Sequence, residues 1–276
     1  MNRLKKKNIW FVRMLAILLV VVILFPFYYV VLTSFKPGSS FYSGSVFPKQ
    51  FTLDNYSSLI NNSKFLLWVK NSTILGGFSA LLTVVVTMFG GYAFSRLRFP
   101  GRKYGILFLM VLQMFPTSVA MVAYFKMLQI AGLLNTLTGI ILIMGLGNAA
   151  FGTWIIRNYL NSIPTEIDEA AYIDGANYWQ TFWKVLFPLM MPILATQFIM
   201  TFIGVYNEYM FSVILLFDPS KYPVGVGIKG FLASNYSVNW TVFCAAAVLG
   251  SLPIIILFLL LQKNITTGLT KGAVKS

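Results

Sequence analysis

Side chains able to do chemistry are scarce in this sequence, and most of the acidic ones gather in one segment. Four of the chain's seven aspartates and glutamates lie between residues 157 and 185, namely Glu166, Asp168, Glu169 and Asp174. There is no histidine, and Cys244 is the only cysteine. Histidine-based acid–base catalysis, a Ser-His-Asp triad, a cysteine-based metal cluster and an intrachain disulfide are therefore excluded. We predict no catalytic residue and no metal site, so the chain is not expected to be an enzyme.

The composition is that of a membrane protein. Hydrophobic residues make up 58% of the chain and charged residues 10%, and the mean hydropathy is +0.76. Soluble domains carry about 25% charged residues. The net charge is +14. In a chain this apolar, such an excess of basic residues is expected to flank membrane spans rather than to bind nucleic acid.

Six uncharged stretches are long enough to cross a bilayer as helices, which takes about 20 apolar residues each. They are residues 14–32, 72–95, 104–125, 137–156, 186–206 and 242–261. They show no lasting alternation of apolar and polar residues, which argues against a transmembrane barrel. Pro26, Pro116, Pro192 and Pro253 lie inside these stretches and are expected to kink the helices rather than to end them. We predict an all-α integral membrane protein with six transmembrane helices, in which residues 1–276 form a single domain.

The distribution of basic residues predicts the orientation of the chain. Of the 21 lysines and arginines, 14 fall on the side of the two termini and seven on the other side. The positive-inside rule therefore places both termini in the cytoplasm. The basic start at residues 2–7 is followed by an apolar run too long for a signal peptide, so we expect the first span to stay uncleaved. In this orientation the acidic loop 157–185 is cytoplasmic.

The acidic loop has the pattern of a short surface helix. Pro164 suits a first turn, and Thr165 with Asp168 resembles a capping box. The acids favour the positive end of the helix dipole. Gly175 is a natural terminator, because glycine accepts the left-handed conformation. We expect about three turns of helix.

Ile167, Ala170 and Ala171 are expected to share one side of this helix. Two placements are open: the helix could lie on lipid, or it could dock on a soluble partner. Interfacial helices favour lysine and arginine on their polar face, and anionic lipid repels carboxylates. The four acids therefore favour docking on a partner.

At this point the sequence resembles a known family. Residues 169–171 (Glu-Ala-Ala), then Gly175, Val185 and 187–188 (Phe-Pro) follow the spacing of the EAA motif found in permease subunits of binding-protein-dependent ABC importers. Val185 and Phe187 stand where that motif has isoleucine and leucine. Further segments are similar to the maltose-type carbohydrate branch of the family; they are residues 32–37, 92–96, 157–160, 163–164, 207–208 and 268–272.

The resemblance implies a function and a set of partners. Two six-helix permease subunits, expected as a heterodimer, would form a sugar pathway in a bacterial inner membrane. An ABC ATPase dimer would drive it, and an extracellular or periplasmic binding protein would deliver the sugar. The resemblance assigns coupling to the ATPase to Glu169, Ala170, Ala171, Gly175 and Pro188. The sequence lacks a phosphate loop, so ATP is expected on the partner subunit and no cofactor on this chain.

Polar residues near the fifth span are candidates for the substrate pathway. They are Gln197, Thr201, Asn207 and Glu208. Glu208 is the one charge in residues 186–216, and an acid inside a membrane is usually functional, although the outer interface would also accommodate it. Gln113 and Asn148, in other spans, are expected to make helix–helix hydrogen bonds.

Two other functions stay open. The first is an ABC permease for a solute such as a polyol, glycerol phosphate or peptide. The second is a self-sufficient secondary transporter, for which inverted repeats and paired broken helices would be expected. The sequence shows neither feature.

Overall fold

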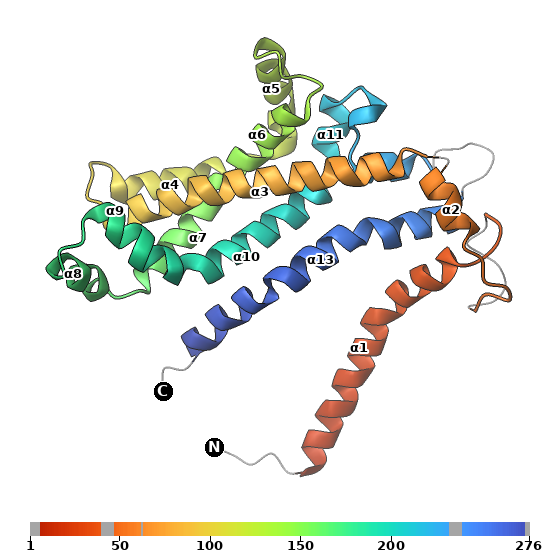
Figure 1. The fold of residues 1–276 in the computed structure, drawn as a ribbon, viewed down its shortest axis with the longest axis horizontal. Helices are drawn as coiled ribbons and strands as arrows, with labels where there is room; N and C mark the ends of the chain where they lie inside the picture. Colours follow the sequence, from red (N-terminus) through yellow and green to blue (C-terminus); the bar gives the residue numbers. More distant parts are fainter. Residues whose placement is uncertain (1–5, 40–46, 62, 232–238, 274–276) are drawn as a thin grey trace. The chain divides into compact units, whose positions relative to one another are not determined.

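The computed structural model describes residues 6–39, 47–61, 63–231 and 239–273 (Figure 1). Within these ranges the regular structure is helical, with no strand. The chain divides into two compact units. One comprises Met1–Leu66 and Gly227–Leu252, and the other comprises Leu67–Val226 and Pro253–Ser276. The prediction of a single domain over residues 1–276 stays a prediction.

In the first unit, a buried amide joins the end of one helix to two other segments. The side-chain NH2 of Asn55, in α2 (Asp54–Asn61), donates to the backbone oxygens of Ser34 and Lys36, each at 2.9 Å. Ser34 is the last residue of α1 (Lys6–Ser34). The hydroxyl of Thr241, near the start of α13 (Trp240–Ala273), donates to Asn55 Oδ1 at 3.1 Å. Asn55 thus satisfies carbonyls that the end of α1 leaves without helical partners.

Most of the remaining elements belong to the second unit. In chain order they are α3 (Phe65–Arg96), α4 (Arg102–Leu112), α5 (Thr117–Ile130), α6 (Leu137–Gly147), α7 (Ala149–Asn161), α8 (Glu166–Ile173), α9 (Tyr178–Gln180), the π-helix η1 (Thr181–Leu186), α10 (Phe187–Tyr206), α11 (Met210–Leu215), the 3-10 helix η2 (Pro219–Lys221) and α12 (Val224–Lys229). The sequence predicted neither α2 nor the π-helix.

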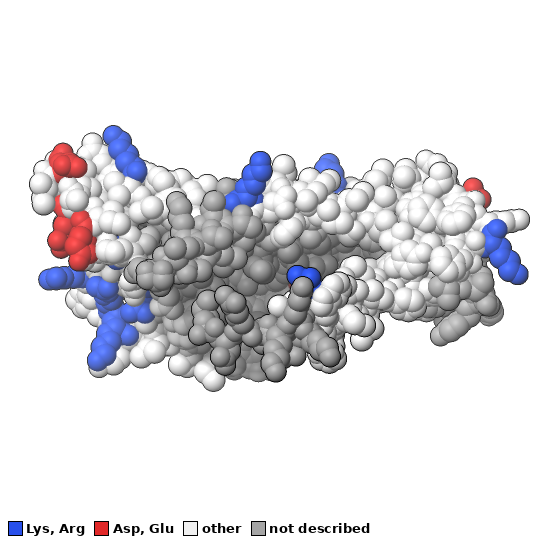
Figure 2. Space-filling view, turned by 90° about the horizontal axis from the view of Figure 1, so that it is seen from below, with Lys and Arg blue, Asp and Glu red and all other residues white. Residues whose placement is uncertain are grey.

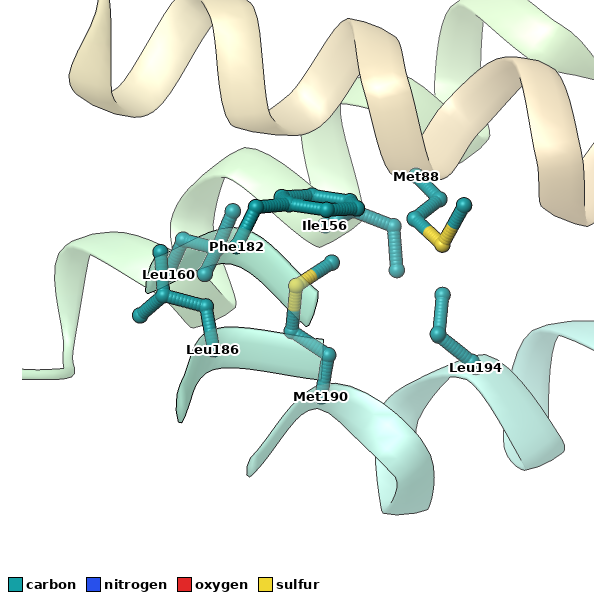
Figure 3. Packing of buried hydrophobic residues seen from close by; sticks show 7 residues of the cluster. All are labelled: Met88, Ile156, Leu160, Phe182, Leu186, Met190 and Leu194. Carbon is teal, nitrogen blue, oxygen red and sulfur yellow. The ribbon is translucent and has the colours of Figure 1, made fainter. Parts of the chain in front are cut away.

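A core of the second unit forms where α3, α7, η1 and α10 meet. Its buried residues are Met88, Ile156, Leu160, Phe182, Leu186, Met190 and Leu194 (Figure 3). Burying a side chain of this size stabilises a fold by about 1.5–3 kcal/mol. Phe182 and Leu186, both in η1, bring the chain back into this core directly after the acidic loop. The loop is therefore anchored at its return to the hydrophobic part of the unit.

Glycine allows α3 and α7 to approach each other closely. A Cβ added at Gly91 would lie 2.5 Å from Cγ2 of Ile156 and 3.1 Å from the backbone nitrogen of Arg157. At Gly77, in the same helix, an added Cβ would meet nothing within 4 Å. The two glycines therefore make a matched pair, one crowded and one open.

We expect Gly91→Ala to destabilise the protein by about 1–3 kcal/mol, because the added methyl forces the two helices apart. Gly77→Ala is expected to be neutral or to stabilise by about 0.5–1 kcal/mol, because alanine loses less backbone entropy in a helix. Thermal unfolding of the purified protein in detergent measures both changes. Equal effects of the two substitutions would contradict the close packing at Gly91.

The described residues contain four helices long and apolar enough to cross a membrane: Ile9–Ser34, Phe65–Arg96, Tyr178–Tyr206 and Trp240–Lys263. A fifth candidate is the pair α6 and α7, which is bent by 41° at Asn148. Pro26, Pro192 and Pro253 lie inside helices and do not end them, as expected, and the kinks predicted at them stay predictions.

The predicted span 104–125 differs from the structure. It is divided between α4, which ends at Leu112, and α5, which begins at Thr117. Pro116 is the N-cap of α5, so it marks a helix boundary and not a kink. The physical reason is that proline has no N–H to continue the preceding helix, and its fixed φ suits the start of the next one.

Candidate functional site

The acidic loop forms a helix, as predicted, and it ends where glycine was expected to end it. Helix α8 has eight residues, which is just over two turns and shorter than the predicted three. Gly175 follows it with φ +83°. Its N–H donates to the backbone oxygen of Tyr172, and the N–H of Ala176 donates to that of Ala171, both at 3.0 Å. These two bonds form a Schellman motif, which requires the left-handed conformation that glycine adopts without strain.

A buried ion pair ties α8 to the end of α3. Nε of Arg96 lies 2.5 Å from Oδ2 of Asp168, and the two side chains are 9% and 8% exposed. Nη2 of Arg96 also donates to the backbone oxygen of Ile163 at 3.0 Å. One guanidinium therefore holds both α8 and the segment that leads into it.

The predicted capping box between Thr165 and Asp168 is wrong. Thr165 is the N-cap of α8, but its side chain makes no capping hydrogen bond. The carboxylate of Asp168 pairs with Arg96 instead. A charge-assisted contact with a guanidinium is roughly twice as strong as a neutral hydrogen bond. Asp168 therefore pairs with Arg96, which is distant in sequence, and not with the nearby Thr165.

The end of α3 is itself held by neighbouring segments. Arg102, the first residue of α4, donates from Nε to the backbone oxygen of Phe94 at 2.8 Å and from Nη2 to that of Ser95 at 2.6 Å. The hydroxyl of Ser95 donates to Oδ1 of Asn161, the last residue of α7, at 2.8 Å. Carbonyls at a helix end have no helical partner, so these bonds stabilise the end of α3 as a base for α8.

The ionisation of Asp168 reflects two opposing causes. Burial raises the pKa of the Asp168 carboxyl, and the nearby charge of Arg96 opposes that rise. The pKa of Tyr172 is also raised, first by burial and then by the negative charge of Asp168. Arg96 therefore favours the charged form of Asp168, whereas burial favours the neutral form.

The side of α8 that faces away from Arg96 is exposed. Glu169, Ala170 and Gly175 are exposed, and Ile173 is 86% exposed. Figure 2 shows acidic side chains gathered over this helix with basic ones beside them. Ala171 is buried against its own chain, so the predicted face of Ile167, Ala170 and Ala171 is divided between the inside and the outside. The outer side of α8 is therefore open to solvent in this chain.

Comparison with known proteins identifies the family. Residues 86–271 match the family described as "Binding-protein-dependent transport system inner membrane component". The chain belongs to this family. It is 33% identical to the maltodextrin transport system permease protein MdxG of Bacillus subtilis, over 94% of this chain and 93% of that protein. It is 36% identical to the maltose/maltodextrin transport system permease protein MalG of Escherichia coli, over 98% of this chain and 97% of that one.

The fold of this permease is also known from a solved structure. A chain of a bacterial ABC transporter involved in the import of the acidic polysaccharide alginate superposes with a TM-score of 0.81, at 26% identity, over 95% of this permease and 99% of that chain. The predictions of an ABC importer permease fold and of a multi-pass inner-membrane protein are therefore confirmed. The number of spans and the orientation of the termini stay predictions.

The sequence missed a second helix start in the permease. The side chain of Asn177 accepts from the backbone N–H of Gln180, and that of Gln180 accepts from the backbone N–H of Asn177, both at 2.9 Å. This is a capping box, and its signal was an asparagine followed three residues later by glutamine. It fixes the turn between α8 and η1.

Two of the predicted pathway residues lie together inside the second unit. Gln197 and Thr201 are buried one turn apart in α10, with Nε2 of Gln197 3.5 Å from the hydroxyl of Thr201. A Cβ added at Gly152, in α7, would lie 2.9 Å from Nε2 of Gln197. Gln197 therefore packs against α7, and its role in the pathway stays a prediction.

The other two predicted pathway residues lie at the end of α10. Asn207 is exposed and donates to the backbone oxygen of Ile203 at 3.0 Å. The carboxylate of Glu208 accepts from the backbone N–H of Phe211 at 2.5 Å and from that of Ser212 at 3.1 Å, and from the hydroxyl of Ser212 at 2.9 Å. Glu208 thus caps α11, where a negative charge is favoured by the helix dipole. Its contact with substrate also stays a prediction.

The last coupling candidate lies apart from α8. Pro188 is exposed and is the second residue of α10, where proline is tolerated because the first amides of a helix need no partner. It follows Leu186 and Phe187, which pack in the core or against it. The structure therefore groups Glu169, Ala170, Ala171 and Gly175 and leaves Pro188 at the return to the membrane.

Proposed function

We propose that this chain is the permease subunit of an ATP-driven carbohydrate importer, and that its substrate is an oligosaccharide such as a maltodextrin. The observation that carries the proposal is α8, a short acidic helix with one side clamped by Arg96 and the other side bare. Such a helix suits a docking surface for a partner protein. The relatives named for maltodextrin and alginate transport support a carbohydrate as the solute.

In this proposal α8 is the coupling helix. A separate ATPase dimer would contact Glu169, Ala170 and Gly175, and its closure on ATP would move α8. The Arg96–Asp168 pair and the capped end of α3 would pass that motion to the membrane helices. The ATPase thereby biases a membrane element with two arrangements, through contacts that differ between them.

We further propose six spans, with both termini in the cytoplasm. The four long helices count as four spans, the bent pair α6 and α7 as a fifth, and the interrupted pair α4 and α5 as a sixth. This count places α8 on the same side as the termini, where 14 of the 21 basic residues lie. A second permease subunit would complete the pathway, and a binding protein would deliver sugar from outside.

Purification and reconstitution test this function. The complex purified from native membranes is expected to contain an ABC ATPase and a second permease. In proteoliposomes, labelled maltodextrins are expected to enter only when ATP and the binding protein are supplied. Uptake by this chain alone, or without the ATPase, would show that the proposal is wrong and would favour a secondary transporter.

We expect Gly175→Asp to abolish uptake while the protein still inserts in the membrane. Both a side chain at positive φ and a new carboxylate would disturb the end of α8, although a Cβ there meets nothing within 4 Å. The left-handed conformation costs a non-glycine residue roughly 1–2 kcal/mol. Uptake by membrane vesicles and the amount of the protein in the membrane are measured together.

Gly101→Asp is the matched control for this substitution. Gly101 has φ +84° and is equally open, but it precedes α4. Gly101→Asp therefore introduces the same backbone strain and the same charge as Gly175→Asp, but away from α8. Uptake lost equally in both variants would assign the effect to strain and not to the coupling surface.

A further inference from the structure

A pocket of the permease lies where α4 ends and where α6 meets α7. The pocket has a volume of about 450 Å³, and its lining includes Gln113, Phe115, Tyr124, Asn148 and Phe211. Gln113 is the residue that follows α4, and Asn148 is the residue between α6 and α7. Small-molecule pockets in proteins usually measure about 300–1,000 Å³. All of the lining residues belong to the second unit.

The pocket gives a physical reason for the end of α4 and the bend between α6 and α7. In the hydrocarbon of a membrane, irregular backbone is tolerated only where protein buries it or where it lines a water-filled cavity. Here the side-chain NH2 of Gln113 donates to the backbone oxygen of Gly147 at 3.1 Å and so joins the end of α4 to the end of α6. This bond is the helix–helix contact predicted for Gln113. The NH2 of Asn148 instead donates to the backbone oxygen of Met144, in the preceding turn of α6, at 2.7 Å.

The lining has the chemistry that a neutral sugar needs. Gln113 and Asn148 use their amide nitrogens on backbone carbonyls, and in the described part of the chain their amide oxygens accept no hydrogen bond. These oxygens can accept from hydroxyl groups. The rings of Tyr124 and Phe211 lie 5.7 Å apart, tilted by 50°, and offer apolar faces to the C–H side of a sugar. Among the residues that the structure describes, no charged one lines the pocket.

We propose that this pocket binds a sugar ring of the oligosaccharide during its passage through the permease. The inference rests on the proposed function, because it takes the solute to be an oligosaccharide. It adds Gln113 and Asn148 to the candidate substrate-binding residues, whereas the sequence predicted only helix–helix hydrogen bonds for them. A lipid chain is a poorer occupant, because it would leave the two amide oxygens without a donor in an apolar surrounding.

Cysteine protection tests the proposal in the whole complex. Ala120 lines the pocket, and Ala131, after the end of the same helix, lies outside it and is exposed. Ala120→Cys and Ala131→Cys are each exposed to a charged, water-soluble thiosulfonate, with and without maltotriose, and with and without ATP turnover. Modification is read by mass spectrometry of this chain, in which the buried Cys244 is the internal reference. Sorbitol at the same concentration controls for solution effects.

We expect the cysteine at position 120 to react with the charged reagent and maltotriose to slow that reaction. At a sugar concentration about ten times its Kd, mass action predicts about tenfold slower modification. The cysteine at position 131 is expected to react equally with and without sugar. Protection in either the resting or the cycling complex supports the proposal.

Three outcomes would overturn the proposal. Reaction at position 120 with only a lipid-soluble maleimide would assign the pocket to lipid. Absence of reaction with every reagent would indicate that the second permease covers the pocket. Free reaction that sugar does not slow would indicate that the pocket is open to water but does not bind the sugar. If uptake of maltodextrins is intact in these cases, the pocket assignment alone fails, whereas a native complex that transports no oligosaccharide contradicts the proposed function itself.

Discussion

We expect Glu169→Lys to abolish ATP-driven uptake of sugar while the permease still inserts in the membrane. Glu169 is exposed in the first turn of α8, so its loss removes only a favourable interaction with the helix dipole, about 0.3–1 kcal/mol. Across a docked interface the same substitution reverses a charge. Truncating one partner of a buried charge pair costs about 2–5 kcal/mol, and a reversed charge adds repulsion to that loss.

The measurement separates coupling from folding. Uptake by vesicles, ATP hydrolysis by the complex and the amount of permease in the membrane are determined for the same preparation. We expect uptake to disappear and the amount of permease to stay unchanged. Weaker attachment of the ATPase is expected when the complex is purified in detergent.

Asp54→Lys is the matched control for Glu169→Lys. Asp54 is also an exposed acid in the first turn of an eight-residue helix, α2, which lies in the first unit. It reproduces the loss at the helix dipole without touching α8. Normal uptake by the Glu169→Lys permease, or an equal loss of ATPase in both variants, would rule out the coupling role of Glu169.

The features that the sequence predicted well are those that local chemistry decides. The membrane character follows from composition, and the end of α8 follows from the conformational freedom of Gly175. The permease family was predicted from the residues and spacing of the motif that begins at Glu169. None of these features depends on a residue far away along the chain.

The missed features depend on tertiary contacts or on the backbone. Asp168 looked like a capping partner for Thr165, but Arg96, brought beside it by the fold, takes its carboxylate. Hydropathy runs through residues 104–125 without a break because it counts side chains, whereas Pro116 interrupts the backbone hydrogen bonds. The capping of α11 by Glu208 could be recognised only once the position of that helix was known, and the role of Glu208 in the substrate pathway stays a prediction.

The second large effect is expected at the buried ion pair. Asp168→Leu leaves the Arg96 guanidinium in a nearly buried place without a negatively charged partner, and arginine cannot lose its proton to become neutral. Removing one member of a buried pair costs about 3–5 kcal/mol. We expect α8 to detach from α3 and uptake to fall severely. Thermal unfolding of the complex and trypsin cleavage within residues 157–185 measure the two consequences.

Arg96→Met is expected to be milder, and its effect is expected to depend on pH. Burial already raises the pKa of Asp168, and loss of Arg96 removes the charge that opposes this rise. The destabilisation by the ionised carboxylate is fully present above the raised folded-state pKa, and it declines as the pH falls from that value to the lower unfolded-state pKa. The defect of Arg96→Met should therefore shrink on acidification, whereas that of Asp168→Leu should not, because Arg96 stays charged.

The double substitution Arg96→Met with Asp168→Leu tests whether the pair stabilises the fold or positions α8. Replacing both charges by apolar side chains is often nearly neutral for stability, so we expect the double variant to unfold at a higher temperature than Asp168→Leu alone. Uptake is expected to stay low, because apolar contact fixes α8 less tightly than the ion pair does. Full recovery of uptake in the double variant would show that packing alone holds the coupling helix, and a pH-independent defect in Arg96→Met would contradict the role of the Asp168 charge.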